Sequence, residues 1–167
     1  MLIMNYYRDL FTALEGAGIS YLIVGGVAVN LYGYLRFTSD IDILISLDLE
    51  NLVKLDQLMK SLGYIERLPV KILDLADEKK LTSYIEEKGL KAYTYIGGQG
   101  FRLDLDIIIE ESLNFQSFFC NATMIRSWDL SLPVISIDDL MKMKVVANRD
   151  KDLLDLEALI QIKNENN

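Results

Sequence analysis

The sequence contains no histidine among its 167 residues, and this absence removes several common kinds of active site. Imidazole acid–base catalysis, serine or cysteine triads that depend on histidine, and metal sites with histidine ligands are all excluded. Any general base must therefore be a carboxylate, an amine or a phenol.

Cysteine and long apolar stretches are also scarce. The single cysteine, Cys120, has no partner for an internal disulfide. No apolar run reaches the length of about 18 residues typical of a transmembrane helix, and no cationic and apolar leader is recognisable at the N-terminus. These features predict a soluble, cytoplasmic protein with no membrane partner.

Basic residues are outnumbered: 17 Lys and Arg stand against 25 Asp and Glu, for a formal net charge of −8 at pH 7. This balance disfavours a long surface that neutralises the phosphates of duplex nucleic acid, although it leaves room for a local basic pocket. With 51% hydrophobic residues the chain has enough apolar side chains for one core. We expect a single domain over residues 1–163 and a frayed polar tail over residues 164–167.

A pair of glycines stands between an apolar segment and a short helical segment. Tyr21–Val24 has the character of a buried strand, Gly25 and Gly26 allow the backbone to turn sharply, and residues 27–33 favour a helix. Backbone N–H groups at the start of a helix are unpaired and the helix N-terminus carries partial positive charge. The glycine turn is therefore expected to bind phosphate. The alternative is an ordinary turn, since Gly-Gly pairs are common in turns.

Two aspartates follow in an alternating strand, Asp40–Ile45. Because side chains alternate along a strand, Asp40 and Asp42 share one face, with Ile41 and Ile43 on the other. A divalent cation between the two carboxylates would relieve their repulsion, and magnesium prefers carboxylate oxygens together with water and phosphate. A solvated sheet face is the alternative.

A third acid is expected in the segment Leu103–Ile107, where Asp104 and Asp106 again share one face. Phosphate chemistry that uses two cations rather than one needs more than two carboxylates to hold them. An acid on a neighbouring strand lies within about 5 Å of its partner. The alternative is an edge strand on which Arg102 and Asp104 offset each other in solvent.

The remaining pattern alternates helical and extended segments. Helices are expected over residues 3–15, 48–62, 74–88 and 115–121 and from residue 137 onward with a break near Asn148; strands are expected over residues 91–96, 101–109, 123–126 and 132–135. Ser46 or Asp48 and Ser136 are the expected caps of two of these helices. Gly97–Gly100 reads as a hairpin loop that pairs the two strands around it.

The order of these motifs resembles the nucleotidyltransferase superfamily of polymerase-β type. Its pattern is a strand, Gly-Gly or Gly-Ser, a helix, Asp-x-Asp and a later lone Asp. Gly25 and Gly26 match the glycine turn, Asp40 and Asp42 match the metal-binding pair, and residues 36–39 are similar to the Arg-x-Thr lead-in of small bacterial members. For the third acid, Asp106, in the run Asp106–Glu110 followed by Phe115, fits those members better than Asp104. The resemblance implies an α+β fold: a mixed β-sheet with helices packed on it and a helical C-terminal end.

The C-terminal segments Ile137–Lys144 and Arg149–Asp155 resemble the closing helices of bacterial proteins similar to abortive-infection toxins of type IV toxin–antitoxin systems. The resemblance implies that Lys144 and Arg149, with Arg36, meet the triphosphate of a nucleotide.

Ordinary helix-end charge is the alternative for these C-terminal residues. In that interpretation Asp152 and Asp155 cap their helix and pair with Arg149 or Lys151. For the two aspartates this is the interpretation we favour; for Lys144 and Arg149 both remain open.

The activity implied by the resemblance is transfer of a nucleoside monophosphate from an NTP to an acceptor hydroxyl, with release of pyrophosphate. Two magnesium ions, with manganese as an alternative, would be held by Asp40, Asp42 and Asp106, and Asp106 would face the acceptor. The acceptor stays open among a small molecule, a tRNA end and a partner protein. Because the chain has little room for a separate acceptor domain, a homodimer or a partner protein is expected to complete the cleft.

Two other functions are compatible with the sequence. One is a regulatory or antitoxin-like module that keeps the nucleotide-binding fold and acts through a partner protein. The other is a stable α+β domain whose acidic sheet face has no catalytic role.

Overall fold

A computed structural model describes residues 2–97, 103–109 and 114–165 of the chain. Most of the expected hairpin loop Gly97–Gly100 and the first residues of the expected strand 101–109 lie outside the described residues. So do residues 166–167 of the expected tail, whereas residues 164 and 165 belong to the last helix.

The centre of the molecule is a mixed, seven-stranded sheet in the order β3-β4-β5-β2-β1-β7-β6. Its strands are β1 (Tyr21–Ile23), β2 (Asp40–Ile45), β3 (Ile65–Glu66), β4 (Ala92–Ile96), β5 (Asp104–Ile108), β6 (Thr123–Ser127) and β7 (Leu130–Val134). The pairs β2–β5 and β1–β7 are parallel, and the other neighbours are antiparallel. The predicted mixed sheet and the predicted pairing of β4 with β5 are confirmed.

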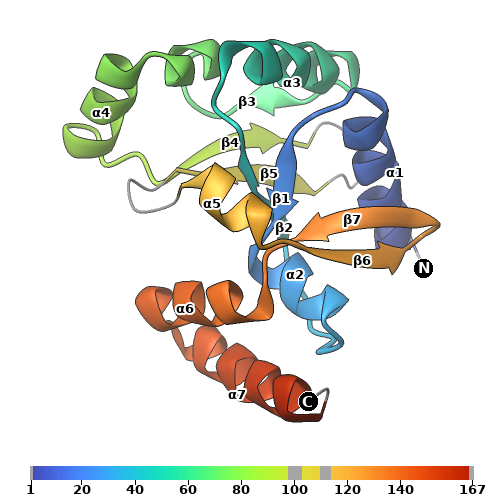
Figure 1. Cartoon of the computed structure of the whole chain (residues 1–167). Coiled ribbons are helices and arrows are strands. Elements are labelled where there is room, and N and C mark those ends of the chain that lie inside the picture. The colour runs from blue at the N-terminus through green and yellow to red at the C-terminus, as the bar shows by residue number, and fades with distance from the viewer. Residues whose placement is uncertain (1, 98–102, 110–113, 166–167) are drawn as a thin grey trace.

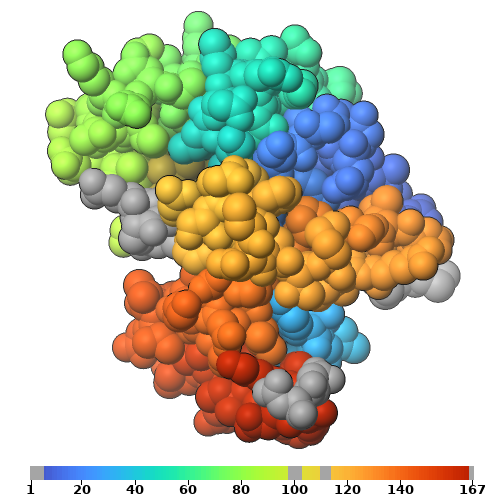
Figure 2. All heavy atoms as spheres, in the orientation of Figure 1, coloured from blue at the N-terminus to red at the C-terminus, as the bar shows by residue number. Residues whose placement is uncertain are grey.

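Helices cover this sheet and extend it at one end. They are α1 (Leu2–Gly16), α2 (Gly25–Leu31), α3 (Leu49–Ser61), the 3-10 helix η1 (Ile72–Ala76), α4 (Glu78–Glu86), α5 (Phe115–Cys120), α6 (Ile137–Ala147) and α7 (Asp150–Glu165). Figure 1 shows α3 and α4 at one end of the molecule, and the pair α6 and α7 beneath α2 at the other. In Figure 2 the side chains of α5 cover the front between α4 and the β6–β7 ribbon. None of the described helices is long and apolar enough to cross a lipid bilayer.

One face of the central strands forms the core. Along β5 and the first half of β2 the residues Ile41, Ile43, Leu105 and Ile107 are buried and alternate with half-buried residues, whereas β2 ends in the buried run Ile43–Ile45. The alternation around the aspartates is what the sequence pattern predicted for an amphipathic pair of strands. The polar face of the pair is therefore free to hold a site.

Helix ends follow the expected capping chemistry. Asp48 caps α3 by accepting a hydrogen bond from the N–H of Asn51, and Ser46 donates to Asp48 rather than capping the helix itself. Ser136 caps α6 through the N–H of Asp139. Asn148, at the predicted break, adopts the left-handed conformation with φ 47°.

The segment expected to form one helix over residues 74–88 is divided. Asp77 adopts extended backbone angles and accepts hydrogen bonds from the N–H groups of Lys79 and Lys80, so it starts α4 as an N-cap. The residues before it form η1, in which Ile72 and Leu75 are buried. The prediction of a single helix was wrong because a side-chain cap inside the segment stops one helix and starts the next. The short strand β3 was not predicted, since two residues give no pattern.

A buried asparagine fixes α3 against the sheet. The Asn51 Oδ1 atom accepts from the Ser20 N–H at 2.8 Å, and its Nδ2 donates to the carbonyls of Ser20 and Ser46 at 3.1 and 2.8 Å. These bonds join α3 to the backbone just before β1 and just after β2. The same two backbone segments are also joined directly, since the Ser46 N–H donates to the Ser20 carbonyl at 3.1 Å.

We therefore expect Asn51→Leu to lower the free energy of unfolding by about 2–4 kcal/mol, because it removes all three hydrogen bonds that the buried Asn51 side chain makes to the backbone. Urea denaturation followed by circular dichroism measures the change. Asn164→Leu, at an exposed position of α7, serves as the control and should change stability by less than about 0.5 kcal/mol. Equal effects from both substitutions would contradict the role of Asn51.

Candidate active site

Four aspartates line the polar face of the parallel pair β2 and β5. In the register of the two strands Asp40 stands next to Asp104, and Asp42 next to Asp106. Because residues two apart on a strand share a face, all four carboxylates lie on the side opposite the core. The pairing thus collects four negative charges on one surface of the sheet.

Asp42 shows the cost of this arrangement. Burial, followed by repulsion from Asp40 and Asp106, raises the pKa of Asp42 to about 6, although the Gly26 N–H and Lys144 act in the opposite direction. At neutral pH the Asp42 carboxylate is therefore charged in a place that resists its charge. A cation near these oxygens would relieve that strain.

Asp106 and Asp104 differ in their partners. Asp106 accepts a hydrogen bond from the Thr94 hydroxyl at 2.6 Å. Asp104 pairs with the Arg67 guanidinium at 2.7 Å and also accepts from the Gly97 N–H at 2.9 Å. Asp104 is thus neutralised by a basic partner, whereas Asp106 stands beside Asp42.

Hydroxyl groups orient Asp40. Thr38 donates to one of its oxygens at 3.2 Å and Ser39 to the other at 3.3 Å. Thr38 is buried. The loop before β2 therefore holds the first carboxylate in place.

The glycine turn lies directly against these acids. Gly25 has φ +62°, and a Cβ atom built on it would lie 1.9 Å from the Asp42 Oδ2 atom. A Cβ atom on Gly26 would lie 2.6 Å from the Thr38 hydroxyl. Both positions must therefore lack a side chain, because the Asp42 carboxylate occupies the space beside Gly25 and Thr38 occupies the space beside Gly26.

Three basic side chains form an ion-pair network with two fully buried carboxylates of α7. We call it the α6–α7 network; its members are Arg36, Lys144, Arg149, Asp152 and Asp155. Arg36 donates to both oxygens of Asp155 at 2.6 and 2.9 Å. Lys144 pairs with Asp152 at 3.0 Å and with Asp155 at 2.8 Å, and Arg149 pairs with Asp152 at 2.7 Å.

The cations of the network outweigh its anions. Burial raises the pKa of Asp152, but hydrogen bonds from Arg149 and Lys144 outweigh burial and hold that pKa at about 2. Burial also raises the pKa of Asp155, but hydrogen bonds from Arg36 and Lys144 outweigh burial and lower that pKa below its usual range. Both aspartates are therefore charged at neutral pH. Three positive and two negative charges leave one net positive charge.

This network lies beside the acids. An Arg36 nitrogen is 3.1 Å from the position of a Cβ atom on Gly26. Lys144 acts on the pKa of Asp42, and the pKa of Arg149 is raised chiefly by Asp152 and further by Asp42 and Asp40. Only Arg149 is well exposed, with 59% of its side chain accessible, against 5% for Lys144.

Within residues 2–97, 103–109 and 114–165, no three Asp, Glu or Cys side chains already surround a position for a metal ion. Sharing one ion among Asp40, Asp42 and Asp106 therefore requires rotation of side chains. The register of β2 and β5 places the three carboxylates on one face of the sheet.

A sequence model of the family described as "Nucleotidyl transferase AbiEii toxin, Type IV TA system" matches residues 8–167. The chain belongs to the AbiEii nucleotidyltransferase family. It is accordingly a nucleotidyltransferase related to the toxins of type IV toxin–antitoxin systems, as the sequence motifs predicted. No curated protein matches the chain.

Solved nucleotidyltransferases share the fold of this AbiEii family member. The lincosamide antibiotic adenylyltransferase LnuA superimposes with a TM-score of 0.65 at 16% identity, over 95% of this chain and 96% of LnuA. ANT(2″)-Ia, in complex with adenylyl-2″-tobramycin, gives 0.60 at 15% identity, over 96% and 88% of the two chains. A putative nucleotidyltransferase from Thermotoga maritima gives 0.57 at 14% identity, over 97% and 92%. The predicted fold class is confirmed.

The residues singled out from the sequence occupy one region of the AbiEii domain. They come from the glycine turn, the loop before β2, the strands β2 and β5, and the α6–α7 pair: Gly25, Gly26, Arg36, Asp40, Asp42, Asp104, Asp106, Lys144 and Arg149. Their catalytic and binding roles stay predictions.

Sequence reasoning missed part of this region. The expected pairing of Asp152 with Arg149 is present, but Asp155 pairs with Arg36 and Lys144 instead of a neighbour on its own helix. Asp152 and Asp155 are three residues apart, which places both on one face of a helix. This spacing is the one sequence feature that could have indicated that the two aspartates share a partner. The partner Arg36 is 119 residues away and no local pattern identifies it.

Gly25→Ala is expected to lower the free energy of unfolding by at least about 2 kcal/mol, because the methyl group meets the Asp42 carboxylate and the backbone has positive φ. Chemical denaturation measures the change. Gly18→Ala is the matched control, since Gly18 has the same φ of +62° and nothing lies within 4 Å of its Cβ position. Finding Gly25→Ala as stable as Gly18→Ala would refute the close approach.

The raised pKa of Asp42 predicts an unusual pH dependence of stability. Between about pH 4 and pH 6 the folded state binds more protons at this carboxyl than the unfolded state, so stability falls as the pH rises through this window. Asp42→Asn removes the effect. The variant should be more stable than the parent by up to about 3 kcal/mol at pH 8, and equally stable below pH 4.

Urea denaturation at pH 8 and at pH 4 measures this difference. Asp9→Asn, at an exposed position of α1, is the control and should show no such pH-dependent gain. A variant Asp42→Asn that is less stable than the parent at pH 8 would mean that the carboxylate is stabilised in the fold.

Proposed function

We propose that this AbiEii family member is a magnesium-dependent nucleotidyltransferase that moves a nucleoside monophosphate from an NTP to the hydroxyl of an acceptor and releases pyrophosphate. Manganese is the alternative cation. The observation that carries the proposal is the register of β2 and β5, which sets Asp106 beside Asp42, on the face shared with Asp40 and against the glycine turn.

The carboxylates fit the requirements of such a reaction. Asp40 and Asp42 would hold both cations, and Asp106 would complete the site on the acceptor side. Divalent cations, when bound, neutralise charge on the phosphates and favour attack by the acceptor oxygen. The raised pKa of Asp42 supports this assignment, because a cation would relieve the repulsion that raises it.

Asp106 is the proposed base. The Thr94 hydroxyl fixes one of its oxygens at 2.6 Å, which leaves the carboxylate oriented to take the proton of the acceptor hydroxyl. Asp104 is the poorer choice, since its ion pair with Arg67 already neutralises it. No imidazole is needed, because positioning and electrostatic stabilisation carry most of the catalysis in phosphoryl transfer.

The basic side of the site would receive the triphosphate. Arg149 is the exposed cation of the α6–α7 network and is proposed to contact the phosphates directly. Arg36 and Lys144 point their charged groups at Asp155 and would act on the phosphates through space and by fixing α7. Gly25 and Gly26 would let the phosphates approach the backbone on the same side, where the Gly26 N–H also acts on Asp42.

A protein partner has one observation in its favour. Apolar side chains are exposed on α6 and α7: Val145, Val146, Leu153, Leu154 and Ile160. Such a surface favours contact with a second copy or with a partner protein. A regulatory module that acts through a partner is therefore the second candidate function.

The test compares two neighbouring aspartates of β5. The purified protein is incubated with labelled ATP, GTP, CTP or UTP, with magnesium, and with small molecules, tRNA or protein from a cell extract as acceptors. Asp106→Asn should reduce transfer at least about 100-fold, because it removes both a cation ligand and the base. Asp104→Asn should retain transfer within a few-fold. The reverse order would assign the third acid to Asp104.

Chelation and metal replacement complete the test. EDTA should abolish transfer, and magnesium or manganese should restore it. Magnesium together with the NTP should also raise the melting temperature of the parent protein, but not that of Asp42→Asn. No transfer to any acceptor, together with a copurifying protein, would favour the regulatory module instead.

A further inference from the structure

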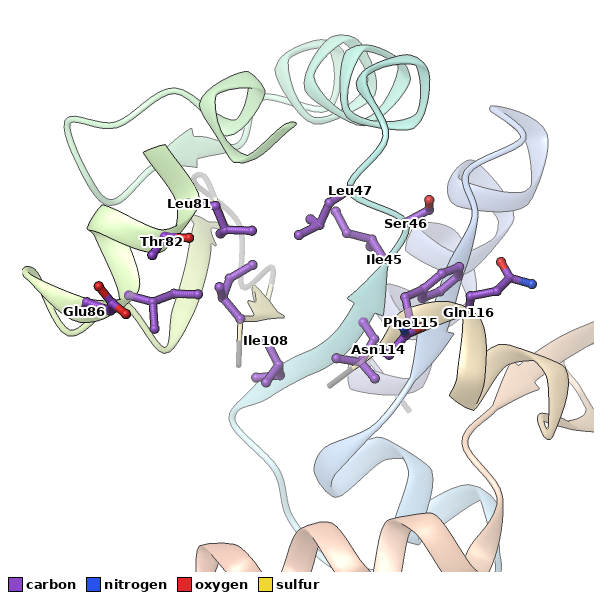
Figure 3. A pocket seen from close by; sticks show the side chains of 13 residues that line it. Ile45, Ser46, Leu47, Leu81, Thr82, Glu86, Ile108, Asn114, Phe115 and Gln116 are labelled. Carbon is purple, nitrogen blue, oxygen red and sulfur yellow. The ribbon is translucent and has the colours of Figure 1, made fainter. Parts of the chain in front are cut away.

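A pocket lies between α4, α5 and the carboxyl ends of β2 and β5. Its volume is about 390 Å³. Figure 3 shows Leu81 and Thr82 of α4 on one side, Asn114 and Phe115 at the start of α5 on the other, and Ile108 of β5 on the border between them. Cavities of this size hold small organic molecules.

The pocket adjoins the acidic face of the sheet. Leu44 and Ile108 both line it. Leu44 follows Asp42 by two residues on β2, and Ile108 follows Asp106 by two residues on β5, so each lies on the same face of the sheet as that aspartate. Residues two apart on a strand are about 7 Å from each other. A molecule in the pocket that extends past the half-buried Ile108 would therefore bring a group to Asp106.

The lining defines the chemistry of the occupant. Most of the inner side chains are apolar and branched or aromatic, among them Ile45, Leu47, Ile85 and Phe115. Hydroxyl and amide groups from α4 and α5 add hydrogen-bonding partners. Among the lining residues that the structure describes, Glu86 alone carries a charge. The pocket thus favours an apolar body with neutral or positive charge and disfavours a polyanion.

We propose that this pocket binds the acceptor, and that the acceptor is a small hydroxyl-bearing molecule with an apolar body and no negative charge. The inference rests on the proposed function and names the substrate class of the same site. The acceptor oxygen forms a bond to the α-phosphorus of the NTP, and the bond from that phosphorus to the bridging oxygen breaks. The hydroxyl proton passes to Asp106, and pyrophosphate carries away the bonding electron pair.

The pocket is tested first without the reaction. The probe is the neutral dye N-phenyl-1-naphthylamine, whose fluorescence rises in an apolar site. Thr82→Trp fills the pocket from an exposed position of α4 and should weaken dye binding at least 10-fold. Lys79→Trp, exposed on the same helix and outside the lining, is the matched control and should leave binding unchanged. No dye binding by the parent, or equal binding by both variants, overturns the pocket.

A second pair of variants tests the charge. The anionic dye 8-anilinonaphthalene-1-sulfonate should bind the parent more weakly than the neutral dye does. Glu86→Lys should strengthen its binding at least threefold, because it reverses the charge in the lining. Glu87→Lys makes the same charge change one residue outside the lining and should have a smaller effect. Equal effects would overturn the assignment of charge preference.

The link to transfer is tested with the labelled NTP and the three acceptor classes. Label should enter the small-molecule fraction, and Thr82→Trp should lower that transfer at least 10-fold, while the magnesium- and NTP-dependent rise in melting temperature stays unchanged. Transfer to tRNA or protein, or normal transfer by Thr82→Trp, overturns this inference and leaves the proposed function standing. Failure of the parent to transfer to any acceptor defeats the proposed function, whereas the dye experiments still decide whether the pocket binds.

Discussion

The parallel pairing of β2 with β5 is the constraint on which the rest of the site depends. Its register places Asp42 beside Asp106 and Asp40 beside Asp104, so like charges gather on one face of a sheet whose other face is the core. Burial makes this gathering costly, as the raised pKa of Asp42 shows. A fold that keeps such an arrangement has to surround it with compensating groups.

Those groups come from segments far from the strands. The α6–α7 network carries one net positive charge and attaches the C-terminal helices to the loop before β2 through Arg36 and Asp155. Its buried carboxylates are fully paired, which is the condition under which buried charge is tolerated. The same contacts set the orientation of Arg149, whose side chain remains exposed beside the acids. The same ion pairs thus stabilise the C-terminal helices and set the electrostatics of the site.

Much of the fold could be predicted because local patterns are strong here. Alternation along β2 and β5 predicted both the strands and the face of each acid, and the caps of α3 and α6 followed from Asp48 and Ser136. The prediction failed over residues 74–88, where the cap at Asp77 competes with a continuous helical pattern. It also missed β3, whose two residues are defined only by their pairing with β4.

The sequence by itself determined the chemistry: the lack of histidine, the glycine turn, the paired aspartates and the family to which the chain belongs. Those properties depend on residue type and short spacing, which a linear sequence carries directly. Only the tertiary structure decided that Arg67 neutralises Asp104 while Asp106 stands beside Asp42, that Asp155 holds Arg36, and that a pocket opens next to Ile108. Each of these is a contact between distant segments, and strand register and helix packing fix such contacts only when the whole chain has folded.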